Sequence, residues 1–332
     1  MPYKERLKKG VERKKEKVKY KVTNWTQYNQ SLRRRGMISL YFPQGDIKDL
    51  FINDKPYVKG DSGRLATYLT PYIQLIYTLY RLFGWGQRQI TGYFEDLWKS
   101  KGLNIPVPSF GHICDLFSQI SVQVKQFCNK VCNKIKNGEA IDLIADSTGL
   151  TFGKASHWYE TKYNKPCNNK PWKKMHISND PDLDIHAIEI TDYDVADIDM
   201  LEQLMPQEVE VGKVIADGAY YSIAGTQALN EKGITPVIPP PAHAVVHGKD
   251  NTTWHDMIVQ YIKEKGTVYA FHKKYGYGER ALAESQFSRI KRCIGSSLLT
   301  QKTESQKQEG KIIGNIINQW NSFGRCVSVK IG

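Results

Sequence analysis

Two short apolar runs in the second half of the chain each lead directly into an aspartate. The first occupies residues 140–145 and precedes Asp146, and the second occupies residues 214–216 and precedes Asp217. Short apolar runs of this kind are typical of buried strands. When such strands are neighbours in an open α/β sheet, their carboxyl ends lie at the edge where these sheets bind ligands. The sequence therefore predicts two carboxylates at one edge of a sheet.

Strand and helix patterns alternate around these two runs. We expect a hairpin from residues 172–177 and 185–191, a further strand over 235–238, and helices over 197–205, 223–232 and 279–295. This order predicts an α/β fold over residues 139–300, in which a mixed sheet is flanked by helices.

The preceding region, residues 23–138, is predicted to be mainly helical. Apolar side chains recur at helical spacing over residues 70–83 and 87–99, and Ser109 follows a Pro-Val-Pro break as the cap of a third helix. Three short helices with a tight break before the third suit a helix-turn-helix, although a plain helical bundle explains them equally well. In the first interpretation, the helix beginning at Ser109 reads DNA and His112 contacts the groove.

Charge points to a polyanionic partner. The 332 residues carry a formal net charge of +13, and nucleic acid is the commonest partner of so basic a chain. Residues 1–22 hold ten Lys and Arg against three Glu and are expected to be a disordered basic tail that contacts phosphates, unless they are merely a solvated segment. We treat residues 301–332 as a C-terminal tail.

Composition excludes several other classes of protein. The mean hydropathy of −0.50 argues against a membrane protein, and we expect a cytoplasmic, nucleoid-associated one. Six scattered cysteines complete no zinc set and are expected to be reduced thiols. The chain also lacks a phosphate-binding loop, a Gly-x-Ser-x-Gly elbow and a zinc-protease histidine pattern.

A third acidic residue, Glu284, lies among basic and phenolic side chains. On an α-helix, Tyr277, Arg280, Glu284 and Lys291 would fall within an arc of roughly 60°. A charge-paired surface helix is the ordinary explanation of such spacing. Two cations that bracket a single glutamate, however, also suit phosphate binding beside a metal ion.

Together these segments resemble the DDE transposases of bacterial insertion sequences, in particular the IS5-like family and its IS903-like group. The resemblance covers residues 24–297. It rests on Asp146-Ser-Thr-Gly149, Lys170-Pro-Trp-Lys-Lys-Met-His-Ile177, Asp217-Gly-Ala-Tyr220 and Tyr277-x2-Arg280-x3-Glu284-x6-Lys291, with weaker support from Tyr28-Asn29, Leu32-Arg33-Arg34-Arg35-Gly36 and Val107-Pro108-Ser109. One departure is that residues 239–246 contain no Lys or Arg where a basic residue near DNA is expected.

The resemblance implies an RNase H-like catalytic domain in which Asp146, Asp217 and Glu284 are the catalytic acids and bind two Mg²⁺ ions, with Mn²⁺ expected to substitute. It implies cleavage of DNA at the terminal inverted repeats of an element and transfer of the freed 3′-hydroxyl into target DNA by a homo-oligomer bound to DNA. Tyr277, Arg280 and Lys291 would contact DNA phosphates. Two alternatives remain: a nuclease of the same fold without strand transfer, and a domesticated protein that only binds DNA.

Overall fold

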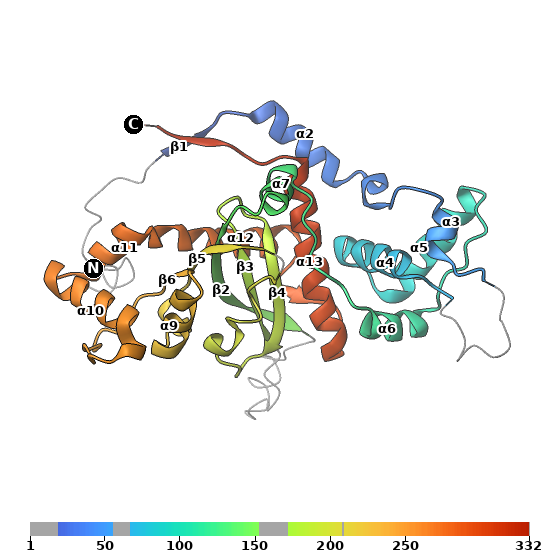
Figure 1. Ribbon diagram of the computed structural model, residues 1–332. Helices are drawn as coiled ribbons and strands as arrows, with labels where there is room; N and C mark the ends of the chain where they lie inside the picture. The colour runs from blue at the N-terminus through green and yellow to red at the C-terminus, as the bar shows by residue number, and fades with distance from the viewer. Residues whose placement is uncertain (1–18, 56–66, 153–171, 208, 332) are drawn as a thin grey trace, which may run out of the picture. The chain divides into compact units, whose positions relative to one another are not determined.

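The structure is a computed structural model that describes residues 19–55, 67–152, 172–207 and 209–331 (Figure 1). Segments 1–40 and 323–332 form one compact unit, and residues 41–322 form a second. Residues 1–18 of the expected basic tail, and Lys170 and Pro171 of the resembling segments, lie outside the described ranges.

The centre of the second unit is a mixed six-stranded sheet with the order β4-β3-β2-β5-β6, and β7 pairs with the far end of β2. The bounds of the strands are β2 Ile141–Phe152, β3 Trp172–Asn179, β4 Ile185–Asp192, β5 Val211–Ile215, β6 Thr235–Val237 and β7 Ser297–Leu298. Strands β2, β3 and β4 are antiparallel, whereas β5 and β6 run parallel to β2. This mixed sheet flanked by helices confirms the predicted RNase H-like α/β fold.

Helices cover both faces of the sheet. Successive residues of a strand point to opposite sides, so neighbouring residues of β2 pack against different helices. Ile144 of β2 belongs to a buried cluster with Trp254 and Phe271, on the side of α10, α11 and α12. Its neighbour Ala145 belongs to a separate cluster with Leu229, on the side of α9. The helices are α9 Ile223–Glu231, α10 Thr253–Lys265, α11 Val268–Tyr275 and α12 Ala281–Cys293.

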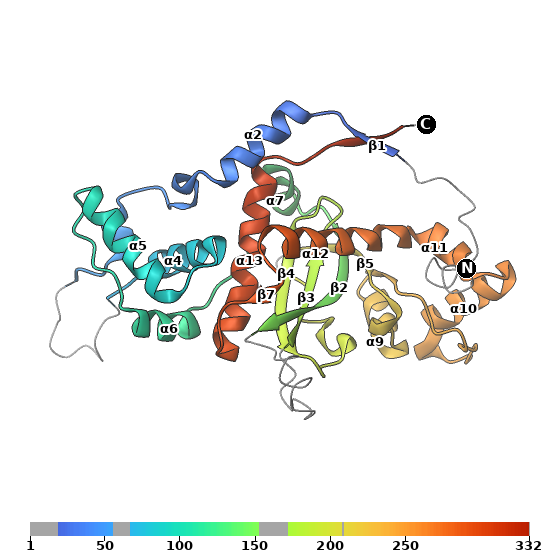
Figure 2. The ribbon, with the colours of Figure 1, turned by 180° about the vertical axis from the view of Figure 1, so that it is seen from behind.

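Residues 301–332, expected as a tail, contain the long helix α13 (Thr303–Phe323). Two glycines let α13 approach β4 closely: a Cβ added at Gly310 would lie 2.7 Å from Ile190 Cγ1, and one added at Gly314 would lie 3.4 Å from Ile188 Cγ2. Figures 1 and 2 both show α13 between the sheet and the helices formed by residues 47–119.

The α-helices of this unit before the sheet in sequence are α3 Ile47–Phe51, α4 Thr70–Phe83, α5 Gln87–Ser100, α6 Phe110–Gln119 and α7 Asn129–Lys136. An aromatic cluster holds three of them together: Phe51 stacks on Tyr72 with ring centroids 4.6 Å apart, and Trp98 Nε1 donates to Tyr72 Oη at 2.8 Å. The expected tight break before the third helix is wrong. The short connection, residues 84–86, joins α4 to α5. The α5–α6 connection begins with a turn at residues 101–102, and the prolines at 106 and 108 then keep it free of helix up to residue 109.

Three predicted elements have different limits in the structure. Strand β2 continues through Asp146 because its pairing with β3 persists to Thr151. Residues 197–205 form only a short 3₁₀ helix, η2 (Asp197–Met200), since aspartates favour caps and turns over helix interiors. The helix expected over 279–295 is a 3₁₀ turn, η5 (Tyr277–Arg280), followed by α12, because Gly276 at φ 75° ends α11 directly before it.

The first unit consists of α2 (Trp25–Arg35) and a two-stranded antiparallel ribbon of β1 (Lys19–Val22) and β8 (Ser328–Ile331). No helix in the described ranges is both long enough and apolar enough to cross a membrane. The five cysteines within those ranges are free thiols.

Candidate active site

Asp146 lies within β2 and is almost buried, with a relative exposure of 9% for the residue. Its Oδ1 accepts a hydrogen bond from the Ser147 amide at 2.8 Å, and its Oδ2 accepts one from Arg280 Nη1 at 3.0 Å. Burial raises the pKa of Asp146 above the usual value. The Ser147 amide and Arg280 oppose that rise, whereas the negative charges of Asp217 and Glu284 add to it. The three carboxylates are therefore close enough to affect one another.

Asp217 is brought beside Asp146 by the register of two parallel strands. Ile144 of β2 pairs with Ile215 of β5, and each aspartate lies two residues beyond its paired isoleucine. Asp217 also caps a short 3₁₀ helix, η3 (Gly218–Tyr220), where its Oδ1 accepts from the Ala219 amide at 2.9 Å. The predicted juxtaposition of the two aspartates at one sheet edge therefore follows from strand pairing.

Glu284 comes from the first turn of α12 and points away from the core. Its neighbours Ala283, Phe287 and Ile290 are buried and fix that side of the helix against the sheet. Glu284 keeps 60% of its side chain exposed, and its Oε1 accepts a short hydrogen bond from Arg280 Nη2. The amphipathic pattern of α12 thus directs this carboxylate toward the same edge.

Arg280 joins two of the three acids, since its guanidinium contacts both Asp146 and Glu284. Among the described residues, no group of three or more His, Cys, Asp or Glu side chains is already arranged to hold a metal ion. In place of a metal ion, the Arg280 guanidinium supplies positive charge between the carboxylates of Asp146 and Glu284. All three acids offer oxygen ligands, which hard cations such as Mg²⁺ prefer. The chemistry of this donor set therefore fits a hard divalent cation.

Lys291 and Tyr277 also lie around the acids. Lys291 Nζ donates to Thr148 Oγ1 at 2.7 Å, which fixes the lysine over the strand segment that carries Asp146. Tyr277 stacks on His272, with ring centroids 4.3 Å apart and an interplanar angle of 20°. Burial raises the pKa of Tyr277. All six residues of the predicted constellation are thus brought together, although Tyr277 and Arg280 occupy η5 and not the α-helix on which their spacing was interpreted.

Ser109 and His112 lie elsewhere, on α6 of the helical region. Ser109 is the N-cap of α6, and its Oγ accepts from the His112 amide at 3.4 Å. His112 is exposed and lies edge-on to Tyr68 at 5.4 Å between ring centroids, while Ile113 and Phe117 are buried on the opposite side of the helix. The first turn of α6 therefore presents His112 at the surface.

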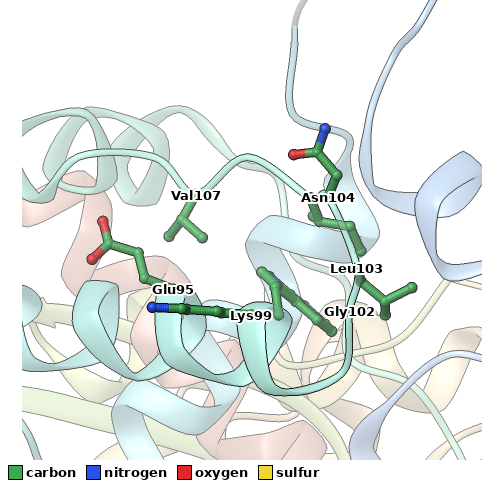
Figure 3. A pocket seen from close by; sticks show the side chains of 8 residues that line it. Glu95, Lys99, Gly102, Leu103, Asn104 and Val107 are labelled. Atoms are coloured by element: carbon green, nitrogen blue, oxygen red, sulfur yellow. The ribbon is translucent and has the colours of Figure 1, made fainter.

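Figure 3 shows a pocket in the same region, between α5 and the extended connection to α6. Glu95 and Lys99 project from α5, and residues 102–105 and Val107 form the other wall. None of the residues around the acids lines this pocket.

Two residues near the acids were not assigned roles from the sequence. Tyr220 is 1% exposed, and its pKa is raised by burial and by the charges of Asp197, Asp146 and Asp217. Thr148 receives the Lys291 hydrogen bond described above. Thr148 lies in segment 146–149 and Tyr220 in segment 217–220, and both segments carry the resemblance. Their position in these segments is the sequence signal that could have identified them.

Three carboxylates at one edge of an RNase H-like sheet are typical of a class of proteins that process nucleic acids. The chain matches the family model described as "Transposase DDE domain" over residues 137–317, and a second model with the same description over residues 33–154. The first match covers more than half of the chain, which therefore belongs to the DDE transposase family. No solved structure matches the chain.

Proposed function

We propose that this chain is the transposase of an IS5-like insertion sequence of the IS903-like group. It cuts DNA at the ends of the element and transfers the freed 3′-hydroxyl into target DNA. One observation carries the proposal: Arg280 contacts both Asp146 and Glu284, at the sheet edge where strand register also sets Asp217.

In this proposal Asp146, Asp217 and Glu284 hold Mg²⁺, and Mn²⁺ substitutes for it. Bound there, the metal would supply stabilisation of the negative charge that develops on the oxygens of the reacting phosphate. Arg280, which joins two carboxylates here, would contact the scissile phosphate. Lys291 and Tyr277 steady adjacent phosphates from the same side.

The DNA partners are the terminal inverted repeats of the element and the target DNA. We assign residues 139–300 to catalysis and residues 23–138 to DNA binding, with Ser109 and His112 of α6 at the DNA. The protein acts as a homo-oligomer on DNA, in the nucleoid. Transposases act on DNA, and the basic net charge of the chain agrees with a DNA partner.

Amide substitutions test the assignment of the acids. Asp146→Asn, Asp217→Asn and Glu284→Gln keep side-chain shape but remove the charge that binds the metal, so each should abolish cleavage and joining of end DNA while DNA binding persists. Glu279→Gln is the matched control, because Glu279 is an exposed carboxylate on the adjacent turn. Cleavage at the wild-type rate by Glu284→Gln in Mg²⁺ would refute the site.

The joining step separates this proposal from the RNase H-fold nuclease. That enzyme would use the same acids to cut but would not join a pre-cut end to a target duplex. Supplying a pre-cut end with a free 3′-hydroxyl and measuring its covalent attachment to target DNA therefore decides between the two. A domesticated protein that only binds DNA would give neither product.

A further inference from the structure

The positive charge of the chain is concentrated in one of its two compact units. Segments 1–40 and 323–332 hold fifteen Lys and Arg against three Asp and Glu, whereas residues 41–322 hold thirty-two against thirty-one. Twelve of the thirteen net positive charges thus belong to the smaller unit. The larger unit, with the acids and the helical region, is almost neutral, so long-range attraction to a polyanion must come mainly from the smaller one.

The described part of the smaller unit has no acidic side chain at all. Residues 19–40 and 323–331 contain neither Asp nor Glu, so nothing within this part of the unit can neutralise its cations. Seven basic residues share it: Lys19, Lys21, Arg33, Arg34, Arg35, Arg325 and Lys330. Of these, Lys19, Lys21 and Lys330 are exposed, so their charge can act on a partner that brings negative charge of its own.

These cations come from segments about three hundred residues apart, and Asn24 ties the segments together. Its side chain donates to the Arg325 carbonyl at 2.8 Å and accepts from the Val327 amide at 2.8 Å. The side-chain amide thus bonds to this segment in the way that the backbone of a neighbouring strand would. The Thr23 amide adds a third hydrogen bond, to the Val327 carbonyl. Beside this clamp, β1 and β8 lie side by side in both views (Figures 1 and 2).

Helix α2 is held to the same segment. Gly324, at φ 126°, approaches so closely that an added Cβ would lie 3.2 Å from Ser31 Cβ. The Arg34 guanidinium lies 5.0 Å from the centroid of the Phe323 ring. The basic last turn of α2 and the basic ribbon are therefore parts of one folded frame.

The ribbon itself is exposed on both faces. Lys19 and Lys21 share one face, and Lys330 shares the other with Tyr20. Every residue of β8 is exposed, as is Tyr20 at 68%. A two-stranded ribbon without a core is marginally stable alone, and a ribbon of this width fits the major groove of duplex DNA.

We propose that this unit, formed jointly by β1, α2 and β8, binds the phosphate backbone of duplex DNA irrespective of sequence. The inference rests on the proposed function, which requires DNA. It adds which part of the chain supplies the electrostatic attraction to DNA. It assigns the strand 328–331 to DNA binding together with residues 19–35.

Charge removal at two matched places tests the inference. Lys19→Gln/Lys21→Gln/Lys330→Gln takes three charges from the ribbon, and Lys232→Gln/Lys263→Gln/Lys265→Gln takes three from exposed lysines of the larger unit. Binding of a random-sequence duplex is measured against salt concentration, with EDTA present so that no cleavage occurs. We expect the ribbon variant to flatten the slope of log K against log salt by about 0.9 for each lysine that contacts phosphate, and the control to keep the wild-type slope.

Two further variants guard against a folding artefact. Lys19→Arg/Lys21→Arg/Lys330→Arg keeps the charges and should keep the slope, whereas Asn24→Ala loosens the clamp and should weaken binding without removing a charge. Equal slopes for the ribbon and control variants would overturn the inference. Because the assay involves no chemistry, it stays distinct from the proposed function: if the acids proved dispensable for cleavage, the difference in salt slope would be unaffected.

Discussion

Arg280 Nη1 donates to Asp146 Oδ2 at 3.0 Å, although the two residues are 134 positions apart in the sequence. The same guanidinium contacts Glu284. A fixed cation beside two carboxylates offsets their mutual repulsion and holds them close together before any ligand arrives. In the proposed reaction it would lie beside the phosphate charge that develops during strand cleavage. Arg280 is therefore expected to contribute to both the arrangement of the acids and the reaction.

Replacing Arg280 should slow the reaction more than it weakens binding. Loss of one donor to transition-state charge typically costs about 10²-fold in rate, so Arg280→Gln should lower single-turnover cleavage by about that factor at saturating DNA. Arg280→Lys should recover little, because an ammonium cannot contact two carboxylates in the planar fork of a guanidinium. Wild-type turnover by Arg280→Gln would show that the guanidinium is only structural.

A buried ion pair links the helical region to α13. Arg81 and Glu309 are 2% and 0% exposed, with Nε and Oε1 3.4 Å apart. The Glu309 carboxylate also accepts from the amides of Leu299 and Thr300. Removing one partner leaves an unpaired buried charge, so Arg81→Met should lower the free energy of unfolding by about 3–5 kcal/mol. Urea denaturation measures the change.

The exposed pair of Lys302 and Asp115 is the control for that prediction. Their nitrogen and oxygen are 2.9 Å apart, but both side chains are 59% exposed. Surface pairs contribute less than about 1 kcal/mol, so Asp115→Asn should shift the urea midpoint little. Similar losses for the two variants would contradict the importance of burial.

Stability should fall in mild acid because of His176. The imidazole is fully buried in β3, and burial lowers its pKa to about 4 from an ordinary 6.5, against an opposing effect of Asp197. Between these pH values the unfolded chain binds a proton that the folded chain does not, so stability rises with pH across this window. The slope is about 1.4 kcal/mol per pH unit for one group.

Comparing the wild type with His176→Gln isolates this effect. The variant has no titrating group at position 176, so its free energy of unfolding should depend less steeply on pH between 4 and 6.5. Above that window the two pH profiles should run parallel. Parallel profiles throughout would mean that His176 is not the group that binds the proton.

Local signals made much of the site predictable. An apolar run that ends in aspartate is visible within a few residues, and so is the spacing of Arg280 and Glu284. The turn carrying Tyr277 and Arg280 was misassigned because Gly276 ends the preceding helix there. Long-range pairing leaves no local pattern, so neither the register of β2 with β5 nor the β1–β8 ribbon was predicted. Helix α13 did have a signal, namely Ile312, Ile313, Ile316 and Ile317 at helical spacing.

Two glycines of α13 should respond oppositely to alanine. In a helix, Gly→Ala ordinarily stabilises by up to about 1 kcal/mol. At Gly314 the new Cβ would meet Ile188 Cγ2 at an ordinary 3.4 Å, so this gain should appear. At Gly310 it would lie 2.7 Å from Ile190 Cγ1 in the core, and such overpacking costs about 1–3 kcal/mol. Thermal unfolding of Gly310→Ala and Gly314→Ala tests the contrast, and equal melting temperatures would contradict the close approach of α13 to the sheet.

Selectivity for element ends should depend on the first turn of α6. Ser109 caps the helix and His112 is exposed there, and a helix of this kind can set its N-terminus against phosphate while its first turn reaches base edges. His112→Ala should therefore reduce the preference of the full chain for end DNA over random DNA and leave its affinity for random DNA unchanged. Asp115→Asn, on the same exposed stretch of helix, is the comparison. Footprinting on end DNA reports the loss directly. If protection by His112→Ala matches the wild type, α6 is scaffold, and end recognition belongs to another surface of the chain.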